Sequence, residues 1–393
     1  MIRALEVQNF LSLAKLTLSL GRRNVLVGAN MAGKSNIIHL FKFLRQMVSP
    51  ASGMYGLSAA FNALGGFPEV AWRGGESNLI SLRLEGDLTG LRIDNQDAYW
   101  EYAIQIVANR LHPGPITIQD ETLLVREPGR AYKLIRKDEG SGRRVIVNAS
   151  GEAITELREN ERSALEYELP NWEGDLVRRL FMSFRFYRFI PELMKRASAT
   201  AATGALDENG GNLAAWLMTF QTRYREYFDK VLQAAKAVLP DIENIYTIPT
   251  PQSQVFIASA EASLKTPVPA WHLSDGEVTI IALLSLVFSP PDLTAPLYLI
   301  EELENHLHPR LLETLQQLLD QQQQAMGDRA AQIIITTHSP KVVDLTSPDD
   351  LIVVEKRNGA TVCRRPAAND NIRKLLEEAG LGELYYSGAL RGA

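Results

Sequence analysis

The most informative chemistry in the chain lies at Gly28 to Ser35, where the sequence GANMAGKS fits the phosphate-loop pattern G-x-x-x-x-G-K-[S/T]. An apolar run at 24–27 precedes it, and residues 36–44 follow with apolar side chains at helical spacing. A strand, a Gly-rich turn and a helix aim backbone N–H groups at one point and favour an anion there. Lys34 would reach the β- and γ-phosphates of a nucleotide, and the Ser35 hydroxyl would bind Mg²⁺. The alternative is a chance match in a loop that contains glycine.

A second candidate anion site is the segment LSDGE at 273–277, which opens an apolar helix over 278–288. Ser274 and Gly276 at a helix N-terminus would present a hydroxyl and backbone N–H groups to an anion. The alternative is a plain N-terminal cap, which is the usual meaning of Ser or Asp before an apolar helix.

Two apolar strands each end in polar residues. PLYLIEE at 296–302 ends in Glu301 and Glu302, and QIIITTHS at 332–339 contains His338. A parallel sheet presents its active residues at the carboxyl ends of the strands. Glu301 could hold Mg²⁺ there, Glu302 could orient the attacking water, and His338 could donate to a γ-phosphate. The alternatives are a solvated strand end for the acids and a structural role for the histidine.

Two other clusters have both a functional and a structural interpretation. His306 and His308, in ENHLHP, could form a metal pair. Residues 178–196 interleave basic and aromatic side chains, as nucleic-acid platforms do. An amphipathic element with core aromatics and solvated arginines gives the same pattern. We favour this structural interpretation, because the formal net charge of −5 gives no support to nucleic-acid binding.

The bulk composition bounds the class of protein. With 393 residues and 46% hydrophobic content, the chain can bury the core of one large or two ordinary domains. The single cysteine, Cys363, excludes internal disulfides and cysteine-based zinc clusters and suits a reducing compartment. The N-terminus lacks an apolar signal core, and the longest apolar run, 278–288, is too short to span a bilayer. We therefore expect a cytoplasmic protein with no membrane partner.

The apolar pattern outside the motifs predicts a mixed α/β chain. Alternating residues predict strands over 2–7 and 15–20, which we expect to join strand 24–27 in one sheet. One long amphipathic helix is expected over 211–238, with Pro240 stopping it. The segments expected to form an antiparallel meander are 81–85, 99–107, 116–125, 131–135 and 144–147.

Around the meander the pattern changes several times. Residues 51–75 are rich in Gly, Ala and Ser and predict a loop with a short helix. The stretch 151–189 turns helical and charged, and strands return at 244–248 and 254–258. From Trp271 on, helix and strand alternate as in a parallel α/β sheet.

Taken together and in this order, the phosphate loop, LSDGE, LYLIEE and ITTHS resemble the motifs of ATP-binding cassette (ABC) ATPases. The chain resembles most of all the RecF/SMC-type heads and the ATPase part of the OLD (overcoming lysogenization defect) family. The likeness rests on NF-x-S before a GxNxxGKSN loop, on LIEELENHLHP and on QIIITTHSPKVVD, and covers about residues 1–45 and 265–355. The ending LGELYYSGALRG resembles the tail of short stand-alone ATPases of this group.

The resemblance implies an α/β fold, namely an ABC-type P-loop ATPase head with an antiparallel β subdomain and a helical insertion. It implies an ATPase lobe formed by 1–75, with the Walker A loop, and by 261–393, with the signature, Walker B, D-loop and switch histidine. The β subdomain would span 76–150 and the helical insertion 151–260.

The resemblance also implies a role for each motif residue, with ATP and Mg²⁺ as cofactors. Glu302, His338 and Lys34 would be catalytic, and Ser35 and Glu301 would hold the metal. Asn305 and His306 would lie in the D-loop at a dimer interface. The residues that would bind nucleotide are Gly28, Asn30, Gly33, Lys34, Ser35 and Asn36, with Ser274 and Gly276 contributed by a partner subunit.

The sequence departs from the family pattern at several places. Asp275 and Glu277 replace the commoner Gly and Gln of LSGGQ, and Leu303 replaces the usual Pro. Glu301 stands where many cassettes have Asp, and Leu11 where the group often has Arg. The region expected for the Q-loop, 184–191, offers no glutamine.

Chain lengths between motifs narrow the class further. The gap from Ser35 to Leu273 is too long for a transporter cassette, and no sustained heptad indicates SMC arms. Full OLD proteins carry a C-terminal TOPRIM nuclease domain, for which the stretch after His338 is too short. We therefore expect that this chain does not cut nucleic acid itself.

Two functional classes follow from this reading. The first is a regulatory ATPase subunit, for example in phage defence, whose ATP state gates a separate effector such as a nuclease or toxin. The alternative is a DNA-associated ATPase clamp in DNA repair or genome maintenance, with DNA as a ligand. Both imply a homodimer, or a higher oligomer of such dimers, with ATP held between two subunits.

Overall fold

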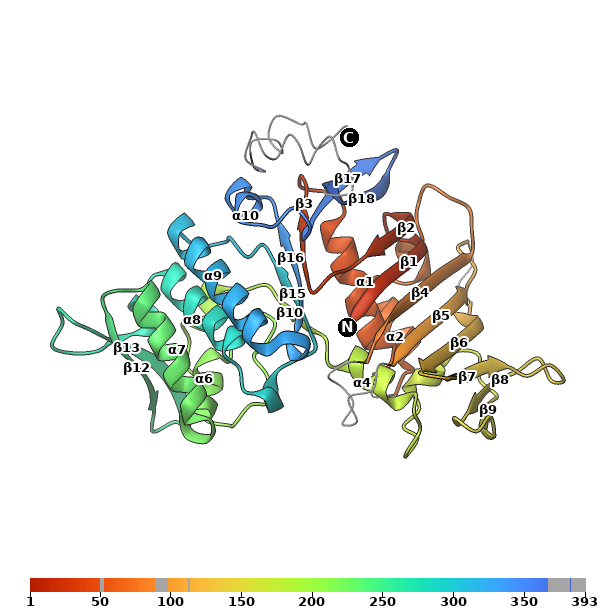
Figure 1. Cartoon of the computed structure of the whole chain (residues 1–393), viewed down its shortest axis with the longest axis horizontal. Helices are drawn as coiled ribbons and strands as arrows, with labels where there is room; N and C mark the ends of the chain where they lie inside the picture. The colour runs from red at the N-terminus through yellow and green to blue at the C-terminus, as the bar shows by residue number, and fades with distance from the viewer. Residues whose placement is uncertain (50–52, 89–97, 112–113, 367–381, 383–393) are drawn as a thin grey trace. The chain divides into compact units, whose positions relative to one another are not determined.

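The computed structural model describes residues 1–49, 53–88, 98–111, 114–366 and 382 (Figure 1). The ending LGELYYSGALRG lies outside the described residues except for Gly382. The chain divides into two compact units, each described here by itself. Unit 1 comprises residues 1–184, 332–338 and 346–393, and unit 2 comprises residues 185–331 and 339–345.

Unit 1 contains an eight-stranded antiparallel sheet in the order β2-β1-β4-β5-β6-β7-β8-β9 (Figure 1). Buried and exposed side chains alternate along these strands, which leaves one face polar and one apolar. The meander expected between residues 78 and 148 is therefore confirmed. Its strands are β1 (Ile2–Phe10), β2 (Leu13–Ser19), β4 (Leu79–Asp87), β5 (Tyr99–Val107), β6 (Thr117–Glu127), β7 (Arg130–Lys137), β8 (Arg144–Val147) and β9 (Ala153–Leu157).

Helices pack on the apolar face of this sheet through aromatic rings. Phe10 of β1 meets Phe43 of α1 with ring centroids 5.4 Å apart, and Phe43 meets Phe61 of α2 at 5.0 Å. Trp100 of β5 contacts Phe181 of α4 at 5.8 Å. The rings cross edge to face, the arrangement that aromatic quadrupoles favour. The helices of unit 1 are α1 (Lys34–Met47), α2 (Gly56–Asn62), α3 (Phe67–Val70) and α4 (Asp175–Met182).

One buried carboxylate organises the far part of the sheet. Glu121 on β6 is completely buried and forms an ion pair with Arg144. It also accepts hydrogen bonds from the Tyr102 hydroxyl at 2.8 Å and the Ser163 hydroxyl at 2.6 Å. The backbone N–H of Ala164 donates to it at 3.0 Å. Because all of these donors converge on one group, the charge of Glu121 is compensated inside the core.

The strand that leads into the phosphate loop belongs to a second set of strands in unit 1. β3 (Arg23–Val27) lies between β16 (Gln332–Thr337) and β17 (Leu351–Arg357) and runs parallel to both. β18 (Ala360–Arg364) pairs antiparallel with β17. Every residue of β3 and β16 is buried, as expected for parallel strands.

The expectation that strands 2–7 and 15–20 join strand 24–27 is wrong. β1 pairs with β2 on one edge and β4 on the other. Both edges of β1 are therefore occupied, and β3 has its own parallel partners on both sides. Alternation along a strand predicts which side chains are buried but does not say which strand lies next to it.

Unit 2 contains a parallel strand pair and a small antiparallel sheet. β10 (Arg185–Tyr187) runs parallel to β15 (Leu297–Glu301). β13 (Gln254–Glu261) pairs with β12 (Ile242–Pro249), β11 (Ser198–Ala199) and β14 (Val268–Pro269).

The helices of unit 2 surround α8, which is apolar on nearly every side and buried. The Trp216 indole on α6 donates to the Ser285 hydroxyl on α8 at 3.0 Å. The helices are α5 (Pro191–Met194), α6 (Leu213–Arg223), α7 (Arg225–Val238), α8 (Asp275–Val287), α9 (Pro309–Met326) and α10 (Pro340–Asp344). Short 3₁₀ helices lie at Ala164–Glu166, Ala270–His272, Pro291–Leu293 and Gly327–Arg329.

Three local expectations are corrected. The stretch from Gly151, expected to be helical, begins with strand β9. The loop over 51–75, expected to hold one short helix, contains two, α2 and α3, among its described residues. The single helix expected over 211–238 is broken at Tyr224, whose φ of −133° and ψ of 53° are not helical. Among the described residues, no helix is long and apolar enough to cross a membrane.

Candidate nucleotide-binding site

The phosphate loop joins β3 to α1 in a conformation that only glycine suits at two positions. Gly33 has a φ of +108° and caps α1, which begins at Lys34. A Cβ on Gly28 would collide with the carbonyl oxygen of Val354. The first turn of α1 contains no acidic residue, so its N-terminus presents N–H groups and a positive dipole end without local neutralisation.

Lys34 is buried and folds back over the loop. Its Nζ donates to the carbonyl oxygens of Gly28 at 2.6 Å and Ala29 at 3.1 Å. Asn30 and Ser35 are exposed on the same loop. Residues 28–35 thus combine an ammonium group, an exposed hydroxyl and a helix N-terminus, the groups that bind a phosphate.

Hydrogen bonds to hydroxyl groups of neighbouring elements stabilise this loop. Thr361 on β18 donates to the carbonyl oxygen of Ala32 at 3.0 Å, and its Oγ1 lies 2.6 Å from the Ser12 Oγ. The Asn36 side chain donates to the same Ser12 Oγ at 2.6 Å. Ser12 is the serine of the N-F-x-S motif, so the motif contributes directly to the support of the loop. Gly33 allows this approach, because a Cβ there would collide with Thr361.

His338 lies beside the phosphate loop within unit 1. Thr337 at the end of β16 is in register with Val27 at the end of β3. His338 and Gly28 therefore follow neighbouring parallel strands at the same edge, and His338 is exposed there.

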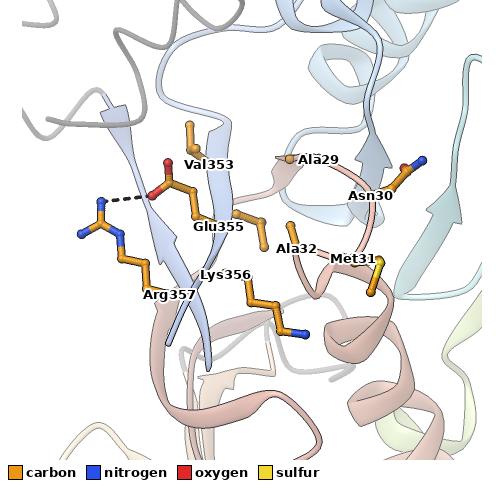
Figure 2. A pocket seen from close by; sticks show the side chains of 10 residues that line it. Ala29, Asn30, Met31, Ala32, Val353, Glu355, Lys356 and Arg357 are labelled. Carbon is orange, nitrogen blue, oxygen red and sulfur yellow. Dashed lines mark hydrogen bonds and ion pairs between the residues drawn. The ribbon is translucent and has the colours of Figure 1, made fainter. Parts of the chain in front are cut away.

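A cavity of about 420 Å³ opens along the first half of the loop (Figure 2). One wall is the loop itself and the other is the end of β17. Glu355 pairs there with Arg357 at 3.2 Å, drawn as a dashed line, and with Arg364 at 2.6 Å. Lys356 is opposite Thr361 in the β17–β18 pair and so shares its face, which makes it a further cation beside the loop. The lining is Gly28, Ala29, Asn30, Met31, Ala32 and residues 353–357.

The two carboxylates lie in unit 2 at the end of the buried strand β15. Glu301 is its last residue, and Glu302 begins the next turn with a φ of +52°. The Asn305 side chain donates to the Glu302 carboxylate at 2.7 Å. Leu303 and Leu307 of the same turn are buried, so leucine in place of the family's proline anchors the turn by packing.

The signature segment forms the N-terminus of α8. Ser274 accepts a hydrogen bond from the N–H of Glu277 at 3.2 Å, and the Glu277 carboxylate accepts from the N–H of Ser274 at 2.7 Å. This capping box is the structural alternative foreseen from the sequence. The hydroxyl of Ser274 is exposed and keeps its own proton for donation, so capping and anion binding are compatible.

The signature and the D-loop touch within unit 2. A Cβ on Gly276 would lie 2.9 Å from the carbonyl oxygen of His306. The Asp275 carboxylate lies 3.6 Å from the His306 imidazole and accepts from the Lys195 ammonium at 2.5 Å. The hydrogen bond from Lys195 lowers the pKa of Asp275.

The structure thus gathers the predicted site residues in two groups. Unit 1 holds the six phosphate-loop positions and His338, and unit 2 holds Ser274, Gly276, Glu301 and Glu302. Each group is described within its own unit.

The structural interpretations of the other clusters fit the geometry. His308 caps α9, its Nδ1 accepting from the N–H of Arg310 at 3.3 Å. Among the described residues, no group of three or more His, Cys, Asp or Glu side chains gathers to hold a metal. Within 178–196, Arg178 pairs with Glu168 and Asp175. The aromatic residues buried there are Phe181, Phe184, Phe186 and Tyr187.

Sequence reasoning missed several residues at these sites. Ser12, Thr361 and Lys356 surround the phosphate loop, and Lys195 holds Asp275. Arg188 directly follows Tyr187, the last residue of β10, which pairs with Ile300. In the sequence, these residues were indicated only by the serine of N-F-x-S and by the basic and aromatic stretch, and neither pattern predicts which residues are in contact.

Cys363 offers no site of its own. It lies on β18, and burial raises the pKa of its thiol to about 12. The thiol is therefore protonated at neutral pH and a poor nucleophile or metal ligand.

The fold and the phosphate loop define an ABC-type P-loop ATPase head. Residues 23–344 match the family described as "AAA domain, putative AbiEii toxin, Type IV TA system", and the chain belongs to this family. It is 27% identical over 181 residues to the "Retron Vc95 probable ATPase" of Vibrio cholerae serotype O1 biovar El Tor. That match covers 41% of this chain and 34% of the relative, so the likeness spans about a third of the relative's length.

Solved structures show the same fold. An SMC head bound to the C-terminal winged-helix domain of ScpA superposes with a TM-score of 0.57 at 15% identity, covering 92% of this chain and 97% of that chain. An SMC head with an extended coiled coil, bound to the C-terminal domain of ScpA derived from Pyrococcus furiosus, gives 0.51 at 13% identity, with 96% and 98% covered. The chain therefore has the fold of an SMC head.

Proposed function

We propose that the chain hydrolyses ATP between two of its own subunits and that its ATP state gates a separate effector protein. The observation that carries the proposal is the phosphate loop, with Lys34 buried against Gly28 and Ala29 at the start of α1. In the proposed site, Lys34 and the N-terminus of α1 bind the β- and γ-phosphates, assisted by Asn30 and Asn36.

Magnesium fits the residues that would meet it. Ser35 is exposed at the start of α1, and Glu301 ends a buried strand, so each presents the oxygen ligands that Mg²⁺ prefers. When bound with ATP, the ion would neutralise charge on the phosphates. Glu302 would orient the attacking water, and His338 would donate to the γ-phosphate.

The second subunit would contribute the signature. Ser274 is exposed and retains a donor, and the N-terminus of α8 around Gly276 offers backbone N–H groups to a phosphate. ATP would thus join two heads, each signature closing the other's phosphate loop.

Gating of an effector is supported by the kind of proteins that the chain resembles. The family description names a type IV toxin–antitoxin system, and the relative in Vibrio cholerae is named "Retron Vc95 probable ATPase". The similar SMC heads were solved with a bound partner domain of ScpA, so heads of this fold bind other proteins. We place the chain in phage defence, in the OLD-like group that its motifs resemble, with a nuclease or toxin as the effector.

Lys34→Ala tests the ATPase part of the proposal. We expect turnover to fall at least about a hundredfold, because the variant removes the cation that stabilises the transferring phosphoryl group. Lys133→Ala, on the exposed side of β7 in the same unit, is the control and should retain full activity. Unchanged turnover in Lys34→Ala would falsify the assignment of the site.

Affinity capture of Glu302→Gln with ATP from the native host tests the gating part. An effector that elutes with the ATP-bound form and not with Lys34→Ala supports the proposal. The competing function, a DNA-associated clamp, predicts instead that DNA stimulates hydrolysis and that this stimulation falls steeply with salt.

A further inference from the structure

We propose that Lys195 and Asp275 form a charge lock that fixes the signature to the D-loop, so that the signature can approach the phosphate of a second copy. Lys195 and Asp275 are positioning residues in this proposal, which rests on the proposed function. It explains why an acid can stand where the family usually has glycine.

An unneutralised Asp275 would oppose the role of the signature. It is the first helical residue of α8, beside the N–H groups that would meet a phosphate. A carboxylate there is favourable for the isolated helix but repels a second anion. The ammonium group of Lys195, 2.5 Å from one carboxylate oxygen, cancels this charge.

The second carboxylate oxygen of Asp275 faces the D-loop. It lies 3.6 Å from the Nδ1 of His306, while the first oxygen accepts from Lys195. His306 has a φ of +68°, and its carbonyl oxygen would lie 2.9 Å from a Cβ on Gly276. One side chain therefore connects three elements: the end of α5, the start of α8 and the D-loop.

Lys195 is held in place by its own surroundings. It follows α5, which packs against α8, and the preceding Met194 is completely buried. Its side chain is 19% exposed, against 42% for Asp275, so the lysine is more covered than in a typical surface pair. The basic and aromatic stretch that includes Lys195 thus contributes a cation to the signature.

Hydrogen exchange without nucleotide tests the lock directly. The backbone N–H groups of Asn305 and Leu307 donate to the carbonyl oxygens of Glu302 and Glu304 within the D-loop turn, at 2.9 and 3.1 Å. Lys195→Met and Asp275→Ala should each raise their exchange rates about threefold or more, since the first leaves Asp275 without its anchor at the end of α5 and the second removes the carboxylate that faces His306. Lys230→Met, which removes a lysine paired with Glu226 on α7, is the matched control and should change neither rate.

ATP-driven association of two copies tests whether the lock lets the signature approach a phosphate. Lys195→Met should weaken this association about tenfold, because the remaining Asp275 carboxylate repels the incoming phosphate. The double variant Lys195→Met/Asp275→Ala should recover to the level of Asp275→Ala, because the repelling charge is gone.

The outcomes separate the lock from the proposed function. Unchanged exchange in both single variants overturns the lock, even in an active ATPase. If the losses in ATP-driven association of the two single variants simply add in the double variant, the electrostatic basis of the lock is overturned. Raised exchange in a protein that never associates with ATP leaves the lock standing and overturns the proposed dimer.

Discussion

At the scale of single residues, the candidate site concentrates unusual backbone conformations. Glu302 and His306 have φ values of +52° and +68°, and Met31 in the phosphate loop has +66°. Residues other than glycine rarely adopt positive φ values, and such backbone strain persists where the surrounding structure enforces it. Buried Leu303 and Leu307 do so for the turn after β15. The Glu302 carboxylate is thus fixed by the backbone as well as by its bond from Asn305.

The two neighbouring carboxylates should separate in their effects. We expect Glu302→Gln to bind ATP with unchanged affinity and to lose at least about a hundredfold in turnover, because the amide cannot act on the water. Glu301→Gln should weaken Mg²⁺-dependent binding, because it removes a charged metal ligand. Fluorescent-nucleotide titration with and without Mg²⁺, beside phosphate release, measures both effects. Equal loss of affinity in the two variants would show that their roles are wrongly assigned.

Glu121 should be the most sensitive charged residue for stability. Glu121→Ala leaves the buried Arg144 without its partner, and we expect unfolding free energy to fall by about 3–5 kcal/mol. Urea denaturation measures this difference. Glu156→Ala breaks the exposed pair with Arg143 and should cost less than about 1 kcal/mol. Similar losses in the two variants would contradict the compensated core network.

At the scale of elements, the β17–β18 hairpin supports the phosphate loop. Thr361 holds the carbonyl of Ala32 and the hydroxyl of Ser12, while Val354 fills the space that a side chain on Gly28 would need. The loop is thus clamped between the turn after β1 and an edge hairpin from the far end of the sequence.

Thr361→Val should therefore weaken nucleotide binding. The isosteric change leaves the buried carbonyl oxygen of Ala32 and the half-buried hydroxyl of Ser12 each short of one partner. We expect a cost of about 1–3 kcal/mol, part of which should appear as lost ATP affinity. Thr361→Ser keeps the hydroxyl and is the control. Calorimetric titration and a melting curve on each variant separate the two effects. A lowered melting temperature with unchanged affinity would mean that Thr361 serves only the fold.

The sequence predicted where helices and strands lie far better than which strands pair with one another. β5 and β8 were expected at their observed bounds, and the helix–strand alternation after Trp271 is present. The break at Tyr224 was missed because both α6 and α7 keep an apolar face, so the periodicity continues across a single non-helical residue. β1 was assigned to the wrong sheet because alternation carries no information about partners.

The site shows the same division. Motifs with fixed spacing identified the phosphate loop and the strand-end acids, because their chemistry depends on residues close together in sequence. Thr361 and Ser12 are 349 positions apart, and Lys195 and Asp275 are 80 apart. Only the folded chain brings such pairs together, so no local pattern could have named them.

At the scale of the whole molecule, the two groups of site residues belong to different units of one head. In the proposed dimer, ATP would be bound by the phosphate loop of one subunit and the signature of the other. Hydrolysis would remove the γ-phosphate and its bridging contacts, so the dimer should loosen after turnover.

Glu302→Gln should therefore accumulate with ATP as a dimer or as a higher assembly of dimers. Adding Ser274→Arg places a bulky side chain at the exposed tip of α8 and should return the protein to its nucleotide-free mass. Light scattering coupled to size exclusion, with and without ATP, measures the shift. An equal shift in both variants would mean that Ser274 is only a helix cap. A constitutive dimer through another surface would hide the shift in mass, so the rate of ATP release is measured in parallel. Slow release in Glu302→Gln that becomes fast in the double variant supports the shared site even in that case.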